Sequence, residues 1–319
     1  MAQAMELIEL HDDAAWDALV EASPQGTVFS RSAYLASLAR PVRRYAIATG
    51  KQIHAVLAAP ENADGTAIVN VEYTPYLGLL FQTDPKALPR QRALEEFRVA
   101  EFAVQALCER YASVAMSLSW HVTDIRPFLW HNYHEPQLGM FKTIPRYTGI
   151  LDLTSGEDFP AQARACRRQE LRKASAFDVR EERDIEQFMY LYAQTFARQD
   201  IALPEATLAL VRRITEAALA DGYGRLASVS TPQGTAAMTL FLFDSRRAYY
   251  LFAANDPAQR NSGAATRLMF ENIEYARARG CTEFDFVGAN SPNRGDFKLS
   301  FNPELKLYFD VRYARGVPA

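Results

Sequence analysis

Apolar and polar residues alternate in the first half of the chain and later recur with a helical period, and this pattern predicts five strands and a long helix. Before them, Asp12 can cap a short helix that runs through Trp16 and Leu19. Gly50-Lys51 has the composition of a hairpin turn. The predicted strands span residues 43–49, 52–58, 67–73, 77–81 and 114–118, and the predicted long helix spans residues 90–111.

The second half repeats this order of strands, helix and strand. Helices are predicted at residues 188–196, 208–220 and 263–279, and strands at residues 225–230, 236–243, 248–254 and 283–287. Leu79-Leu80-Phe81 precedes a helix as Leu251-Phe252-Ala253 does. An internal duplication explains this match, and chance similarity is the alternative.

A chain of 319 residues exceeds the usual size of a single hydrophobic core. We therefore expect an α/β (α+β) protein with domains at residues 1–150 and 151–319. Each domain is predicted to be a mixed, mostly antiparallel sheet flanked by helices.

Composition excludes several classes of protein. Hydrophobic residues make up 49% of the chain, and the net charge of −3 argues against a protein devoted to nucleic acid. The apolar runs are shorter than a membrane span, and the first ten residues lack the order of a signal peptide, so we expect a cytoplasmic protein. Neither the three cysteines nor His131-x-x-His134 has the spacing of a metal site, so none is expected.

The segment between the strand at 248–254 and the helix at 263–279 is the strongest candidate for a binding site. Backbone N–H groups and the helix dipole at such a junction attract phosphate. Gly263 allows close approach, and Arg260 adds positive charge. A glycine near a helix start is also a common structural feature. The candidate donor-binding residues are Phe252, Ala253, Ala254, Arg260, Asn261, Ser262, Gly263, Ala264 and Ala265.

Two further groups of charged residues could contribute chemistry. Asp285 alternates with phenylalanines on the last predicted strand and is a candidate general base, although a surface or salt-bridged acid fits the same pattern. Arg164, Arg168 and Arg172 share one helical face and could bind phosphates, or could form a solvated face. The first-half counterpart of the donor loop, residues 86–90, has no glycine, so we expect no donor there.

Several segments, taken in order, resemble a known family. Arg260-x-x-Gly263-x-Ala265 resembles the R/Q-x-x-G-x-G/A pyrophosphate loop of GNAT acyltransferases. From about Trp16 to Tyr308 the chain is similar to tandem GNAT proteins related to the Fem peptidoglycan aminoacyltransferases. The segments that carry this similarity are Asp124-Ile125-Arg126-Pro127-Phe128 with Trp130, Tyr147-Thr148-Gly149-Ile150-Leu151-Asp152-Leu153, Arg167-Arg168-Gln169-Glu170-Leu171-Arg172-Lys173-Ala174, and Gly288, Phe297-Lys298 and Phe301.

The resemblance implies two GNAT-like domains and an acyltransferase that uses acyl-CoA as donor. The expected acceptor is an amine, of a small molecule or a peptidoglycan precursor, bound in a cleft between the domains. The alternatives are a Fem-like enzyme with an aminoacyl-tRNA donor and a catalytically silent binding protein. The chain lacks the long heptad-patterned hairpin with which some Fem enzymes hold tRNA.

The same resemblance assigns a role to Lys298, which would meet negative charge at the reacting centre, although a solvated surface lysine fits the sequence equally well. Together with Asp285, the candidate base, it is the expected catalytic pair. Tyr73 and Tyr76 are expected to line the acceptor cleft by the resemblance, or to belong to an aromatic core and turn. The expected acceptor-binding residues are Tyr73, Tyr76, Arg168, Arg172 and Phe297.

Overall fold

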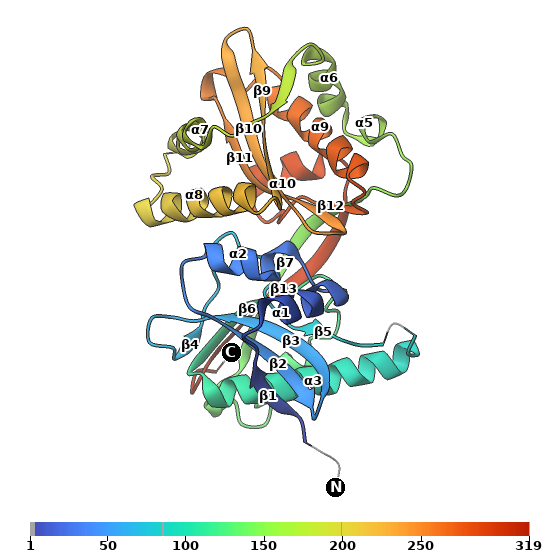
Figure 1. The fold of residues 1–319 in the computed structure, drawn as a ribbon, viewed down its shortest axis with the longest axis vertical. Coiled ribbons are helices and arrows are strands. Elements are labelled where there is room, and N and C mark those ends of the chain that lie inside the picture. The colour runs from blue at the N-terminus through green and yellow to red at the C-terminus, as the bar shows by residue number, and fades with distance from the viewer. Residues whose placement is uncertain (1–3, 85, 199, 319) are drawn as a thin grey trace. The chain divides into compact units, whose positions relative to one another are not determined.

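A computed structural model describes residues 4–84, 86–198 and 200–318 (Figure 1). The chain falls into two compact units, Met1–Arg146 with Leu307–Ala319, and Tyr147–Lys306. The sequence places a boundary near residue 150, but the last segment returns to the first unit. The reason is β13 (Glu304–Ala314), which pairs antiparallel with β6 (Ser113–Ser117) and buries Val311.

The first unit contains a four-stranded antiparallel sheet and a second group of strands. The sheet has the order β1-β2-β3-β5, and β6 pairs with β4 as well as with β13. The four strands of this sheet are β1 (Glu6–Glu9), β2 (Val42–Thr49), β3 (Gln52–Pro60) and β5 (Leu80–Phe81), and β4 (Ala67–Ile68) belongs to the second group. The helices of the first unit are α1 (Asp13–Ala22), η1 (Val28–Ser30), α2 (Ser32–Ser37), α3 (Pro89–Arg110), α4 (Arg126–Trp130) and η2 (Pro136–Leu138).

The sequence patterns locate most of these elements. The β2–β3 hairpin turns at Gly50, whose φ is 60°, and the side chain of Asp12 caps α1 by accepting from the amide of Ala15. The strands expected at 67–73 and 77–81 are shorter in the structure. Tyr73 and Tyr76 have left-handed φ values of 61° and 65°, which interrupt an extended chain between β4 and β5.

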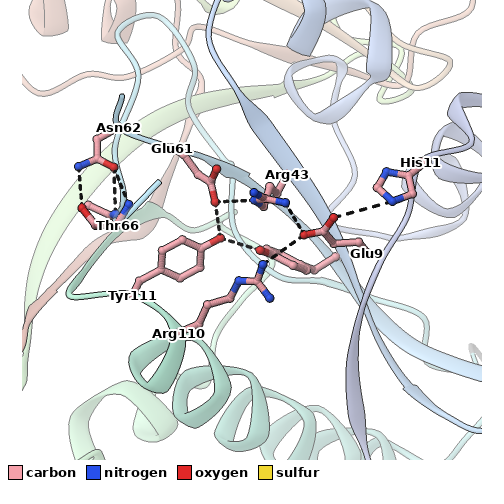
Figure 2. Close-up of polar contacts among 10 residues, drawn as sticks. Glu9, His11, Arg43, Glu61, Asn62, Thr66, Arg110 and Tyr111 are labelled. Carbon is pink, nitrogen blue, oxygen red and sulfur yellow. Dashed lines mark hydrogen bonds and ion pairs between the residues drawn. The ribbon is translucent and has the colours of Figure 1, made fainter. Parts of the chain in front are cut away.

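A polar network, with Glu61 and Tyr111 buried and its two arginines exposed, joins three strands of the first unit to the end of α3 (Figure 2). Glu61 follows β3, and its Oε1 accepts from the Tyr111 hydroxyl at 2.7 Å and from Arg43 Nε at 2.8 Å. Glu9 on β1 accepts from Arg43 at 2.6 Å and from Arg110 at 3.2 Å. Burial raises the pKa of Tyr111, so its hydroxyl keeps the proton that it donates.

The strands of the second unit lie side by side in part of a larger sheet. Taken from β7 (Phe141–Asp152), their order is β7-β12-β11-β10-β9-β8, with β11 and β12 parallel and the other neighbours antiparallel. The remaining strands are β8 (Asp178–Glu181), β9 (Gly224–Thr231), β10 (Gly234–Phe243), β11 (Arg247–Asn255) and β12 (Glu283–Asp285). The helices are α5 (Phe159–Gln162), α6 (Ala165–Lys173), α7 (Ile185–Ala197), α8 (Glu205–Ala220), η3 (Pro257–Gln259), α9 (Ala264–Ala278) and α10 (Pro292–Leu299).

Helices cover both faces of this sheet. In Figure 1, α7 and α8 lie on one side of β9–β11 and α9 lies on the other. Residues 236–243 of β10 are accordingly all buried. The sequence pattern locates α7, α8, α9 and β9–β12, whereas it misses β7, β13 and α10.

Candidate functional site

Two parallel strands of the second unit part from one another beside α9. The ladder between β11 and β12 pairs Arg247 with Glu283, Ala248 with Phe284 and Tyr249 with Asp285. β12 ends at Asp285, while β11 continues to Asn255. Strand backbone beyond the end of a ladder presents N–H and C=O groups to an extended ligand. At Asn255 the backbone amide and carbonyl are already bonded to the Thr195 hydroxyl. The stretch at residues 250–254 therefore has the geometry of a binding edge.

A strained turn follows β12 at this point. Val287 and Gly288 both adopt left-handed φ values, 52° and 76°. A β-branched residue is costly in this conformation, so the surroundings must hold it. The Val287 amide donates to Asp285 Oδ1 at 2.7 Å, and the Gly288 amide donates to Thr148 Oγ1 at 3.0 Å. The Thr148 hydroxyl in turn donates to Asp285 Oδ1 at 2.6 Å, which closes the network.

Lys298 reaches this turn from α10. Its Nζ donates to the carbonyl oxygens of Val287 and Gly288, both at 2.8 Å, and lies 5.5 Å from the ring centre of Tyr250. Tyr250 is the first residue of β11 past the ladder with β12, so the amine lies where the strands part. Burial lowers the pKa of Lys298, Asp285 opposes this shift and Arg294 adds to it, and together they leave the pKa at about 8.

The predicted catalytic pair thus meets at one turn. The side chain of Asp285 is fully buried, so the alternative of a surface acid does not describe it. Glu283, two residues earlier, is the salt-bridged acid, because it pairs with Arg247. Sequence reasoning did not assign a role to Thr148 or to the turn, although Tyr147-Thr148-Gly149 and Gly288 were part of the family resemblance.

The predicted donor loop lies at the N-terminus of α9. Arg260 and Asn261 are exposed, whereas Gly263 and Ala264 are buried. Gly263 has a φ of 87°, and a Cβ at this position would lie 2.6 Å from the backbone oxygen of Glu170 in α6. The close approach that requires glycine is therefore to α6. The role of residues 260–265 in donor binding stays a prediction.

Helix α6 contributes a cation to this loop that the sequence did not single out. Lys173 Nζ donates to the backbone oxygen of Asn261 at 2.5 Å. Thr266 at the start of α9 donates to Glu170 at 2.5 Å and accepts from Arg167 at 2.9 Å. The sequence does contain a sign of this contact, because Lys173 directly follows Arg172 in a segment rich in basic residues.

The structure commits most of the predicted phosphate-binding arginines to other contacts. Arg164 pairs with Asp296 at 2.5 Å, and Arg168 donates to the carbonyls of Ala161 and Ala163 at the end of α5. Arg172 is exposed. The predicted role of Arg168 and Arg172 in acceptor binding stays untested.

The aromatic candidates have clear packing roles. Phe297 stacks under Arg167, with 5.0 Å from the guanidinium carbon to the ring centre. Tyr76 is fully buried, 4.8 Å from Trp120 and 5.2 Å from Tyr308 between ring centres. This packing accounts for an aromatic residue there without any ligand.

Tyr73 and Phe252 both have contacts within the protein. Tyr73 accepts a hydrogen bond from the Tyr34 hydroxyl at its carbonyl oxygen, at 2.6 Å. Phe252 packs in the core, 5.6 Å from Tyr192 between ring centres, whereas Ala253 is only partly buried. The role of residues 252–254 in donor binding stays a prediction.

The described residues form neither a cluster of metal ligands nor a helix that could span a membrane. No three of their histidine, cysteine, aspartate or glutamate side chains gather as metal ligands would. His131 instead packs against the rings of Phe141 and Tyr313. Over residues 4–84, 86–198 and 200–318, every helix is too short or too polar to span a bilayer.

Known proteins resemble this chain in its second unit and in its whole fold. Residues 161–299 match the acetyltransferase (GNAT) domain. The structure of FemX superposes with a TM-score of 0.66 at 15% identity, covering 95% of this chain and 96% of that one. A tandem GNAT protein from the clavulanic acid biosynthesis pathway gives 0.55 at 13% identity, covering 99% and 100%. L-PGS from Bacillus licheniformis gives 0.53 at 12% identity, covering 97% and 93%.

No curated protein matches the chain by sequence. At these identities the structural matches establish the fold, and they agree with the resemblance seen in the sequence. The matched domain lies wholly within the second unit, which also holds the parted strands and Lys298. The chain thus has a segment, residues 161–299, that matches the acetyltransferase (GNAT) domain, and over nearly its whole length it shares the fold of FemX and of a tandem GNAT protein.

Proposed function

We propose that this protein transfers an acyl group from acyl-CoA to an amine acceptor. The GNAT domain and the fold support an acyltransferase in general. The observation that carries the proposal is the parting of β11 from β12 next to the Nζ of Lys298. An extended thioester arm that lay along residues 250–254 would bring its carbonyl to that lysine.

Residues at the start of α9 fit the phosphate end of such a donor. β11 leads directly into the loop, whose exposed Arg260 and Asn261 stand near the positive end of the α9 dipole. Lys173 adds a second cation at Asn261. Both the acyl end and the phosphate end of acyl-CoA therefore have suitable partners on adjoining elements.

The chemistry requires groups that meet charge and protons. Attack of an amine on a thioester creates a negatively charged oxygen, and one donor aimed at it is typically worth about 2.7–4 kcal/mol. We propose Lys298 as the side chain that donates to this oxygen, with Asp285 beside it at the same turn. The acceptor is proposed to be an amine of a small molecule or of a peptidoglycan precursor.

Acyl-CoA is favoured here over aminoacyl-tRNA. A tRNA donor would require several cations free to contact phosphates. Of the three arginines that share a helical face at α6, Arg164 and Arg168 are engaged with Asp296 and with the end of α5, which leaves Arg172 for such contacts.

Binding of the donor can be tested with the purified chain and acetyl-CoA. We expect millimolar acetyl-CoA to raise the melting temperature, because a ligand at 100 times its Kd stabilises the folded state by about 2.7 kcal/mol. Arg260→Glu should reduce this shift. Arg279→Glu, the same change of charge at the far end of α9, should not.

Transfer is then measured as release of free thiol in the presence of candidate amines. A melting curve unchanged by millimolar acetyl-CoA would argue strongly against the proposed donor. Equal loss of the shift in both arginine variants would show that the loop at Arg260 has no special part in binding.

A further inference from the structure

The hydrogen bonds of Lys298 define what its amine can do. Two of the three positions on Nζ outside the side chain point at the carbonyl oxygens of Val287 and Gly288, both 2.8 Å away. Those two positions must be N–H groups in either protonation state, because a carbonyl oxygen only accepts. The third position is an N–H in the ammonium form and a lone pair in the neutral amine.

The carbonyls that hold Lys298 belong to a turn that is itself fixed. Asp285 and Thr148 accept the two amides of this turn, at 2.7 and 3.0 Å. Both side chains are fully buried, so water does not compete for these bonds. The direction of the third position on Nζ is therefore set by the turn.

Burial shifts the amine toward its neutral form, and the two charges near it act in opposite directions. The groups that face it are Asp285 on β12, Arg294 on α10 and the Tyr250 ring on β11. Burial and Arg294 lower the pKa of Lys298, and Asp285 limits the shift, leaving it at about 8. A base with a pKa near the working pH is the most effective proton acceptor.

We infer that Lys298 takes the proton from the attacking amine, and that Asp285 and Thr148 are positioning residues that hold the turn beneath it. The inference rests on the proposed function and assigns a proton acceptor to the same site. It replaces Asp285 as the expected general base, because Asp285 Oδ1 already accepts from Val287 and Thr148.

The proposed step balances. The amine nitrogen attacks the thioester carbon, and a C–N bond forms while a proton passes to the lone pair of Lys298. The resulting ammonium faces the negatively charged oxygen with its third N–H. The C–S bond then breaks, and Lys298 returns the proton to the leaving sulfur, which gives an amide, free CoA thiol and a neutral lysine.

The pH dependence of kcat/KM tests the direction of this proton transfer. The wild-type rate should rise as pH passes through about 8, where Lys298 loses its proton. Lys298→Arg keeps a cation and its donors but cannot accept a proton, so it should lose about 100-fold or more and lack this rise. A separate rise in kcat/KM that comes from deprotonation of the acceptor amine itself would remain in both proteins. A rate that falls through pH 8, or that keeps its rise in Lys298→Arg, would overturn the inference.

Thr148 provides the test of positioning. Thr148→Val removes the hydroxyl that holds the Gly288 amide. We expect the rise in kcat/KM to move from about pH 8 toward the pH that matches the ordinary pKa of a lysine. Thr148→Ser keeps the hydroxyl and should restore the wild-type profile. An unchanged profile in Thr148→Val would remove Thr148 and its turn from the account.

Competitive acetylation of Lys298 by acetic anhydride, read by mass spectrometry across pH, separates this inference from the proposed function. A wild type that transfers no acyl group would count against the function. The labelling curve then decides on Lys298 by itself. Titration near 8 supports a proton-accepting lysine, whereas titration near 10.5 overturns it.

Discussion

Gly263 is required by two independent features of its surroundings. Its φ of 87° is costly for any other residue, and a Cβ would overlap the Glu170 carbonyl of α6. Gly280 follows the other end of α9 with a φ of 89° and open space around the Cβ position. The two glycines therefore separate backbone strain from steric overlap.

We predict that Gly280→Ala lowers the free energy of unfolding by about 1–2 kcal/mol, the cost of a left-handed alanine. Gly263→Ala should cost about 1–3 kcal/mol more, because the new methyl group must displace α6. Urea unfolding of both full-length variants measures the difference. Equal losses would mean that α6 does not press on Gly263.

For individual residues, the sequence predicted which side chains lie at the candidate site better than it predicted the hydrogen bonds between them. Asp285 and Lys298 were named, but the Thr148 hydroxyl that organises their turn comes from 137 residues away along the chain. Spacing rules reach only neighbours along a helix or strand, so a contact of this range has no signature in one sequence.

Among the elements, α6 meets α9 through polar contacts and through the partly buried Leu171, which packs against a core that includes Met269 and Phe270. The hydroxyl of the buried Thr266 bonds both Glu170 and Arg167. Thr266→Val should loosen α6 and speed hydrogen exchange at residues 165–173, by about tenfold for each 1.4 kcal/mol lost.

Thr215→Val is the matched control, because the equally buried Thr215 hydroxyl donates to Val211 within α8. It should leave exchange in α6 unchanged. Unaltered exchange in Thr266→Val would show that other contacts hold the helix.

The elements that the sequence located are those with a single clear period. α3 and α9 carry helical apolar faces, and β10 and β11 are mostly apolar runs between turn residues. β7 contains Pro145 and Gly149 and has an irregular burial pattern, so no period marks it. β13 was detectable, since Phe309, Val311 and Tyr313 alternate with polar residues.

For the whole molecule, the two units differ in how the chain builds them. The second is one continuous segment, Tyr147–Lys306, whereas the first needs Leu307–Ala319 in addition to Met1–Arg146. Val311 and Tyr313 from that last segment belong to the core of the first unit. Local patterns predict a boundary near residue 150, but they do not reveal that the last segment of the chain belongs to the first unit.

We predict that residues 147–306 fold cooperatively when expressed alone, while residues 1–146 do not. Thermal unfolding followed by circular dichroism compares the fragments. Adding the peptide 307–319 to residues 1–146 should restore structure. A cooperative transition in residues 1–146 by themselves would contradict the role given to β13.

Donor binding can be followed by hydrogen exchange of the full chain with and without saturating acetyl-CoA. We expect slower exchange of the amides at residues 250–254 and 260–265, where the strand edge and the start of α9 would hold the donor. Protection confined to the first unit, or no protection at these two segments, would contradict donor binding at this site.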